Sequence, residues 1–283
     1  MGLSLAEMGA QVLNTADGRA KTALSLQYAQ AWQEARAAGN TLEIGTAPAP
    51  DHPARPEAPR LCAPKDVAKR KPGSPEGRIA LLHAVAHIEL NAVDLHWDII
   101  VRFSKTRLPT GFFDDWVRAA AEESKHFNLI CDCLENLGSF YGALSAHAGM
   151  WRAAQDTKTD LLGRLAVVPM VLEARGLDVT PNMIKIFKQA KETQAVEALE
   201  LIYSEEVTHV AYGSKWFNFL CGRDDKDPKQ VFHALVRKYF KGNLKPPFNA
   251  EKRADAGIPP DFYWPLTENI EYPAFLGGKN APD

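Results

Sequence analysis

Two short motifs place a glutamate three residues before a histidine: Glu123 before His126, and Glu206 before His209. On a helix, residues at i and i+3 lie on the same side, so each motif presents a carboxylate and an imidazole together. Carboxylate and imidazole groups are ligands for iron, manganese and related divalent ions. An E-x-x-H motif alone is weak evidence for a metal site, because so short a pattern also occurs by chance.

The apolar residues around these motifs make the metal hypothesis more specific. Glu123 and Glu206 each interrupt a helical stripe that is otherwise apolar, and Glu89 and Glu173 interrupt two further stripes in the same way. An ionised carboxylate on a buried stripe must be paired or bound to metal. The stripes carry no Lys or Arg near these positions, so a set of buried ion pairs is the weaker alternative.

The chain repeats this arrangement. The lone glutamate precedes the glutamate of the next motif by 34 residues in the first half and by 33 residues in the second. Asp94 and Asp178 each follow a lone glutamate by five residues. The repeat predicts two helix pairs related by a pseudo-twofold axis, each supplying half of a dinuclear site. Asp94 and Asp178 are candidates to accept a hydrogen bond from the ligand histidines.

Helical periodicity explains how these residues are positioned. We predict long helices over residues 76–103, 113–137, 159–175 and 194–220, with a long crossover at 139–158. Gly176 is expected to end the third of these helices, and Thr180-Pro181 to begin a short one. Sustained alternation typical of strands is missing from the sequence. The prediction is an all-α fold built on a four-helix bundle.

Other side chains near the motifs could have either a structural or a functional role. His96 lies two turns after Glu89 on the same face; it is an extra ligand or, as we favour, a satisfied core histidine. His83 and His87 lie on a different stripe and are interpreted as structural. Tyr203 and Tyr212 lie one turn to either side of the last motif.

For the two tyrosines, core packing competes with a catalytic, redox-active or hydrogen-bonding role, and they are the candidate catalytic residues. Each motif is also preceded by an additional glutamate, Glu122 or Glu205. For these two residues we favour a solvated face or a hydrogen bond behind the ligands over metal ligation.

With these motifs the sequence resembles the ferritin-like superfamily, and most of all a bacterial family of ferritin-like proteins known as a domain of unknown function. The resemblance rests on GRIALLHAVAHIEL, EESKHF, LEARGLDVTP, EEVTHV and KPPFN, and it extends from about residue 60 to 265. More distantly the sequence resembles the di-iron tRNA hydroxylases, without a specific tRNA signature. The resemblance implies a ferritin-like four-helix bundle, with the crossover between its second and third helices, and six metal ligands: Glu89, Glu123, His126, Glu173, Glu206 and His209.

Mixed carboxylate and imidazole ligation favours two iron ions, with manganese as the alternative. We expect an O2- or peroxide-dependent oxidoreductase or hydroxylase that acts on an unidentified organic substrate. Electrons would come from a separate donor, since the sequence holds no flavin, nicotinamide or rubredoxin-type motif. The alternative is a non-catalytic metal-binding or iron-handling protein. A nucleic-acid partner such as tRNA has no support beyond the distant resemblance.

The composition is that of an ordinary globular protein. The 283 residues are 46% hydrophobic and carry a net charge of −2, so there is no overall basic bias toward nucleic acid. Four cysteines without a Cys-x-x-Cys pair favour a reducing compartment. No apolar run approaches the ~20 residues that span a bilayer, and the N-terminus lacks a secretory pattern, so we expect a cytoplasmic protein without a membrane partner.

Three regions are predicted: N-terminal helices and a Pro-rich arm at 1–75, the bundle at 76–222, and a C-terminal helix with a wrapping tail at 223–283. Residues 4–39 are helical in pattern, whereas 47–75 contain eight prolines and exclude regular helix. We expect this arm to lie over the core. Its basic run from Lys65 to Lys71 is interpreted as solvated, with phosphate or nucleic-acid binding as the alternative.

Overall fold

The computed structural model describes residues 2–40, 42–63, 66 and 70–268. Within these ranges the regular secondary structure is helical throughout, and extended pairing is limited to the isolated bridges Leu61–Ala146 and Leu244–Thr267. The predicted all-α class is therefore confirmed. Most of the basic run from Lys65 to Lys71 lies outside the described residues. In the part of the chain that the structure describes, no helix combines the length and the apolar character needed to cross a bilayer.

The helices agree with the predicted ranges to within a few residues at most ends. The N-terminal stretch is divided in two, because Asp17 begins a second helix by accepting a hydrogen bond from Ala20 N at 2.8 Å. The elements are α1 (Leu5–Leu13), α2 (Gly18–Ala37), α3 (Pro75–Arg102), α4 (Thr110–Asn136), α5 (Gly149–Asp156), α6 (Leu161–Val167), the π-helix η2 (Val168–Glu173), α7 (Ala174–Gln189), α8 (Thr193–Arg223), α9 (Pro228–Tyr239), α10 (Ala250–Asp255), α11 (Pro260–Tyr263) and the 3-10 helix η3 (Trp264–Leu266).

The chain forms two compact units that interleave along the sequence. Unit 1 comprises Met1–Lys158 and Asn182–Glu205, and unit 2 comprises Thr159–Pro181 and Glu206–Asp283. Helices α7 and α8 therefore contribute residues to both units.

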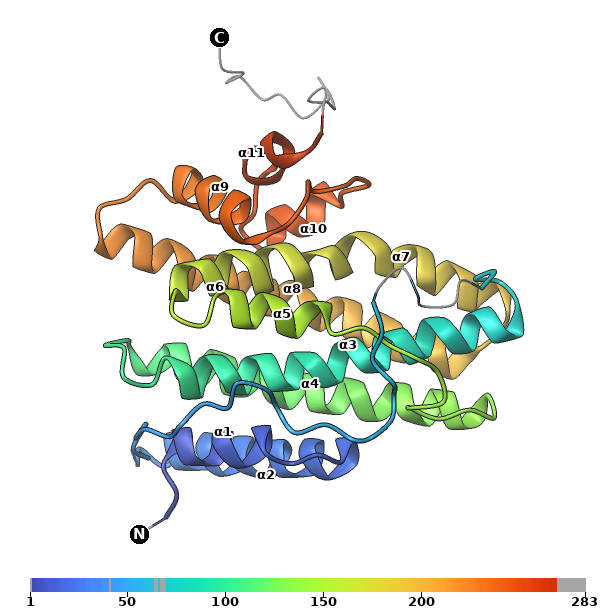
Figure 1. The fold of residues 1–283 in the computed structure, drawn as a ribbon, viewed down its shortest axis with the longest axis horizontal. Coiled ribbons are helices and arrows are strands. Elements are labelled where there is room, and N and C mark those ends of the chain that lie inside the picture. Colours follow the sequence, from blue (N-terminus) through green and yellow to red (C-terminus); the bar gives the residue numbers. More distant parts are fainter. Residues whose placement is uncertain (1, 41, 64–65, 67–69, 269–283) are drawn as a thin grey trace. The chain divides into compact units, whose positions relative to one another are not determined.

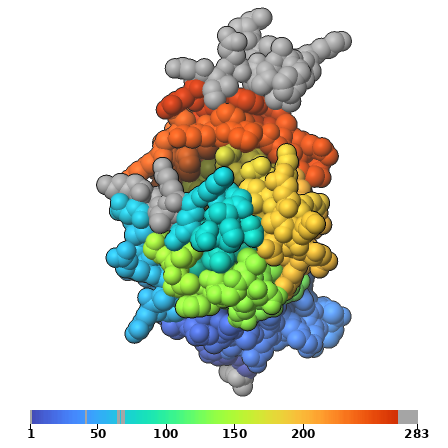
Figure 2. All heavy atoms as spheres, turned by 90° about the vertical axis from the view of Figure 1, so that its right-hand side faces the viewer, coloured from blue at the N-terminus to red at the C-terminus, as the bar shows by residue number. Residues whose placement is uncertain are grey.

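Unit 1 is organised around α3, which is buried along most of its length. Helix α4 packs along α3, while α1 packs on α3 and α2 packs on α4 (Figure 1). A core cluster joins apolar residues of α3 and α4 to residues of α7 and α8, among them Leu82, Leu134, Phe187 and Leu199. Figure 2 looks onto the end of unit 1 where α3 begins, shown in cyan, with the segment after α4 in green beside it.

The Pro-rich arm contacts helices of unit 1 through hydrogen bonds of its backbone. Ala54 N donates to Leu13 O at 2.7 Å, Arg102 Nη2 donates to Pro50 O at 2.8 Å, and Trp151 Nε1 donates to Asp51 O at 3.0 Å. Proline-rich backbone has few donors of its own, so its carbonyls are satisfied by side chains of the helices that it crosses.

Unit 2 builds its core from the second half of α8 and the C-terminal helices. Phe232 of α9 packs edge-on against Phe217 of α8, with ring centroids 6.0 Å apart, and it packs in a tilted arrangement against Phe262 of α11 at 5.4 Å. Helix α6 packs on α9 and continues directly into η2. Aromatic residues of the C-terminal segment therefore pack on α8, the helix that carries Glu206.

The predicted helix end at Gly176 is wrong, as is the predicted start at Thr180-Pro181: α7 runs unbroken through these residues. Proline in a helix leaves the carbonyl four residues earlier without its usual donor. Here the side-chain amide Nδ2 of Asn249 donates to Leu177 O at 3.3 Å and replaces the missing bond. A distant residue thus supports a helix that the local sequence is expected to interrupt.

Candidate metal centre

Unit 1 holds three of the predicted ligands in one buried cluster. Glu89 lies on α3, and Glu123 and His126 lie on α4; each is buried, and each offers one ligand atom within 4.8 Å of the others. The Nδ1 atom of His126 is 3.2 Å from Glu89 Oε2 and 3.4 Å from Glu123 Oε2. The E-x-x-H spacing on α4 and the packing of α3 along α4 together produce this arrangement.

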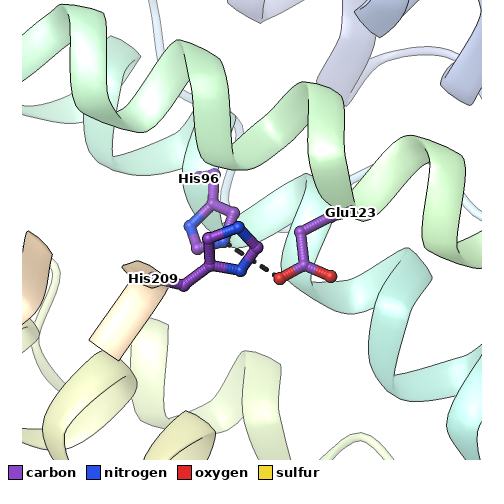
Figure 3. A group of neighbouring side chains, drawn as sticks. All are labelled: His96, Glu123 and His209. Atoms are coloured by element: carbon purple, nitrogen blue, oxygen red, sulfur yellow. Dashed lines mark ion pairs between the residues drawn. The ribbon is translucent and has the colours of Figure 1, made fainter. Parts of the chain in front are cut away.

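His96 joins the same cluster from α3. It is almost completely buried, its Nε2 is 3.5 Å from Glu123 Oε1, and its ring stacks on Trp116 with centroids 5.3 Å apart. Figure 3 shows the imidazole of His96 directed toward the carboxylate of Glu123; the third side chain labelled there, His209, belongs to unit 2. The two oxygens of Glu123 therefore face two different imidazoles of unit 1.

A further carboxylate, that of Glu205, orients His126. Glu205 precedes the second E-x-x-H motif on α8, and its Oε2 is 2.7 Å from His126 Nε2. The Nε2–H of His126 donates to Glu205, so Nδ1 is the nitrogen that faces Glu89 and Glu123. The side chain of Glu205 is 25% exposed, so it links a buried imidazole to solvent. In the sequence, Glu205 can be noticed only because a glutamate directly precedes both E-x-x-H motifs.

Burial and charge determine how this cluster binds protons. Burial raises the pKa of Glu89 well above its ordinary value, and the nearby carboxylate of Glu123 raises it further. Burial alone would lower the pKa of His126, but the carboxylates of Glu123, Glu205 and Glu89 outweigh it and raise that pKa well above its ordinary value. The hydrogen bond from His126 lowers the pKa of Glu205. The cluster thus attracts positive charge, which protons or a metal cation can supply.

Asp94 and Asp178 do not serve the histidines as predicted; each forms a buried ion pair instead. In unit 1, Lys21 Nζ of α2 is 2.5 Å from Asp94 Oδ1. In unit 2, Arg253 of α10 donates from Nε to Asp178 Oδ1 at 2.9 Å and from Nη2 to Oδ2 at 2.7 Å. The repeat correctly marks two equivalent buried carboxylates. Each of them, however, pairs with a lysine or arginine side chain from a helix outside the predicted helix pairs.

Unit 2 holds the other three predicted ligands, all buried: Glu173, Glu206 and His209. Glu173 is the last residue of η2, a π-helical turn of the kind often found at functional sites. Gly213 of α8 allows η2 to come close, since a Cβ atom at this position would lie 2.5 Å from Pro169. A small residue on α8 therefore determines how near the turn that carries Glu173 can approach the helix that carries Glu206.

The remaining candidates are Tyr203 and Tyr212 of α8 and the two histidines His83 and His87 of α3. Tyr203 packs against the core cluster of unit 1, and Tyr212 is partly buried in unit 2. His83 Nε2 accepts hydrogen bonds from Gly142 N at 3.0 Å and Leu144 N at 3.4 Å, which is a structural role, as predicted. His87 has the same kind of role, because its Nε2 donates to His147 O at 3.0 Å and its Nδ1 accepts from Tyr141 Oη at 2.9 Å.

A cavity of about 230 Å³ in unit 1 is lined by His83, His87, Ile88 and His147. The α3 residues that line it lie on the side of the helix away from Glu89. Because oxygen chemistry needs open positions on the metals, we expect a cavity that approaches them, lined by Tyr203, Tyr212 or crossover residues near His147. The cavity that His147 lines opens instead on the outer face of α3.

Comparisons with known proteins place the chain in a family. The model of the family described as "Protein of unknown function (DUF455)" matches residues 14–264. A Haemophilus influenzae protein described as "Uncharacterized protein" is 43% identical over 208 residues, which cover 72% of this chain and 72% of that protein. No solved structure matches the chain. The family match includes every residue of the candidate centre, and the chain belongs to the DUF455 family.

Proposed function

We propose that this protein is a ferritin-like dinuclear metal carboxylate protein that acts as an O2- or peroxide-dependent oxidoreductase. The observation that carries the proposal is the buried cluster of Glu89, Glu123 and His126. Two carboxylates in an apolar core repel each other, and removing charge from water is costly, so such a cluster needs a compensating cation. The oxygen and nitrogen donors suit iron or manganese.

We further propose that the glutamates and histidine of unit 2 complete the centre within a four-helix bundle of α3, α4, α7 and α8. The support is the internal repeat, which gives each half of the chain one lone glutamate and one E-x-x-H motif. In such bundles a glutamate from each of two helices and an E-x-x-H motif from each of the other two hold a pair of metal ions. The complete set is Glu89, Glu123, His126, Glu173, Glu206 and His209.

The side chains have distinct tasks in this proposal. His126 would present Nδ1 to a cation while its Nε2–H stays hydrogen-bonded to Glu205, which fixes the ring. The carboxylates of Glu89 and Glu123 would balance the cationic charge, and the apolar residues of α3 and α4 exclude bulk water. A pair of iron ions, when bound, supplies two-electron reduction of O2 or peroxide. Electrons come from a separate donor protein, and the substrate is an organic molecule.

The test begins with elemental analysis of protein purified without added metal. We expect about two metal ions per chain, and clear losses in Glu123→Ala and in Glu206→Ala. The iron-loaded protein is then reduced without oxygen and mixed with O2 or peroxide, and oxidant consumption is recorded. Rapid consumption that is lost in His126→Ala supports an oxidoreductase. Protein that binds two metal ions and stays ferrous in air for hours would instead be a metal-handling protein.

A further inference from the structure

We infer that His96 is an additional metal ligand, which makes the two metal positions of the centre chemically unequal. The inference rests on the proposed dinuclear function and adds a seventh protein ligand to it. It concerns a histidine that the E-x-x-H pattern does not include. The geometry of Glu123 within unit 1 carries the argument.

Glu123 lies between two imidazoles, one at each carboxylate oxygen. Its Oε2 is 3.4 Å from His126 Nδ1, and its Oε1 is 3.5 Å from His96 Nε2. A carboxylate that bridges two metal ions uses one oxygen for each. The positions beside Oε2 and Oε1 therefore correspond to a first metal with Glu89 and His126, and a second metal with His96.

The distances suit donors that share a cation. Nitrogen and oxygen ligands lie about 2.0–2.2 Å from a metal such as zinc, so two neighbouring ligands of one ion are roughly 3.0–3.5 Å apart. The 3.5 Å between His96 and Glu123 is longer than an ordinary N–H···O hydrogen bond. By contrast, His126 Nε2 and Glu205 Oε2, which form such a hydrogen bond, are 2.7 Å apart.

The helix directs His96 toward the centre. His96 follows Glu89 by seven residues, which is close to two full turns, so the two side chains extend from the same face of α3. Both are buried, and the stacking of His96 on Trp116 holds the imidazole plane in place. Figure 3 shows the ring directed at the carboxylate rather than away from it.

The internal repeat has no matching histidine. The residue seven positions after Glu173 is Thr180, a buried hydroxyl in place of an imidazole. The second metal position thus gains a nitrogen donor that the repeat does not duplicate. Additional imidazole strengthens the binding of late divalent ions such as cobalt, so the two positions should fill with different affinities.

The experiment is a Co²⁺ titration of the full-length, chelator-treated protein, followed by absorbance and by the number of ions bound. We expect two equivalents in two resolved steps for the unmodified chain. His96→Gln should weaken one step at least 10-fold and leave the other unchanged. His83→Gln is the matched control, since His83 is also a buried histidine of α3 but bonds to backbone amides. Two unchanged steps in a folded His96→Gln protein would overturn the inference.

A second measurement needs no variant and so does not depend on folding of the substituted chain. Proton NMR of the Co²⁺-loaded protein shows the exchangeable imidazole N–H signals of metal-bound histidines, shifted by the paramagnetic ion. Three such signals are expected, from His96, His126 and His209, and only two would contradict the inference. An unmodified chain that binds no Co²⁺ would refute the proposed centre itself. Two bound ions with only two histidine signals would refute the role of His96 alone.

Discussion

The orientation of His126 depends on Glu205, a residue outside the predicted ligand set. Removing the acceptor with Glu205→Leu frees the ring to rotate and leaves its buried Nε2–H without that bond. We expect metal affinity to fall about 10–100-fold, the usual effect of losing a partner behind a metal ligand. The measurement is competition for Co²⁺ with a chelator of known affinity.

The matched control is Glu200→Leu, which makes the same change on α8 where Glu200 forms an exposed ion pair with Lys188. This variant should bind metal normally. Equal affinities for the two variants would show that Glu205 does not hold His126.

His83 gives the metal-free protein a pH dependence. Burial, together with the nearby charge of Arg70, lowers the pKa of His83 to about 4. Since the unfolded chain takes up this proton near pH 6.5, the unfolded state binds more protons between pH 6.5 and 4, and the free energy of unfolding falls as pH falls through this range. Protonation of Nε2 would also remove the acceptor for Gly142 N and Leu144 N.

His83→Gln should flatten this dependence, because glutamine has no proton to gain. Urea unfolding of chelator-treated protein at pH 7, 6 and 5 measures the two slopes. The free energy of unfolding should fall more between pH 7 and 5 in the unmodified chain than in the variant. Parallel curves would contradict the assigned role.

Individual residues of unit 1 were predictable to different degrees. The burial of Glu89 and Glu123 could be predicted because each carboxylate interrupts an apolar helical stripe. His96 lies on the same face of α3 as Glu89, yet a buried histidine has several ordinary explanations, and the sequence does not reveal that its Nε2 lies 3.5 Å from Glu123 Oε1. The partner of Asp94 could not be identified, because Lys21 precedes it by 73 residues and approaches it only through the packing of α2.

Two glycines test how the helices position the candidate ligands. In Gly213→Ala the added Cβ would lie 2.5 Å from Pro169, so η2 must shift away from α8. We expect a loss of about 1–3 kcal/mol in unfolding free energy and weaker metal binding, since η2 carries Glu173. Gly176→Ala places the same methyl group where no atom lies within 4 Å, inside α7. That change should stabilise the chain by about 0.5–1 kcal/mol.

Urea unfolding and metal analysis of both variants provide the comparison. An unchanged unfolding free energy and unchanged metal binding in Gly213→Ala would mean that Gly213 does not limit how closely η2 approaches α8. A destabilising Gly176→Ala would mean that α7 needs a glycine for a reason other than space.

At the scale of elements, periodicity predicted the long helices because each has an apolar stripe to bury. It failed between Gly176 and Pro181, where the local signals favour a break. Those signals are propensities worth about 1 kcal/mol for glycine and about 3 for proline, and tertiary contacts can outweigh them. Here the bond from Asn249 and the buried pair of Asp178 with Arg253 support α7 from elsewhere in unit 2.

At the scale of the whole molecule, the two compact units were not predictable from the sequence. Composition indicates a proline-rich arm and helical regions, but the unit boundaries after Pro181 and Glu205 lie within α7 and α8 rather than between elements. The turn between these helices, with the end of α7 and the start of α8, belongs to unit 1 together with α3 and α4. Only long-range packing, such as that of Phe187 and Leu199 in the core cluster, determines this grouping.

Bound metal should stabilise the fold of the whole chain. Metal that binds only the native state stabilises it by about 2.7 kcal/mol at a free concentration 100-fold above its dissociation constant. Chelation should therefore lower the melting temperature of the unmodified chain, and re-addition of Fe²⁺ or Mn²⁺ without oxygen should restore it. Equal melting temperatures with and without chelator would contradict the proposed centre.

Glu123→Gln distinguishes stabilisation by bound metal from destabilisation by carboxylate repulsion in the metal-free protein. The amide cannot replace the ionised bridging carboxylate, so chelator should have much less effect on this variant. It also removes the charge that raises the pKa of Glu89, so repulsion between carboxylates falls, but it removes as well a carboxylate that raises the pKa of His126. Because these two changes oppose each other, the metal-free variant should melt close to the temperature of the metal-free unmodified chain, although it binds metal less well. A metal-free variant that melts well below that temperature would show that Glu123 stabilises the fold by itself, without a cation.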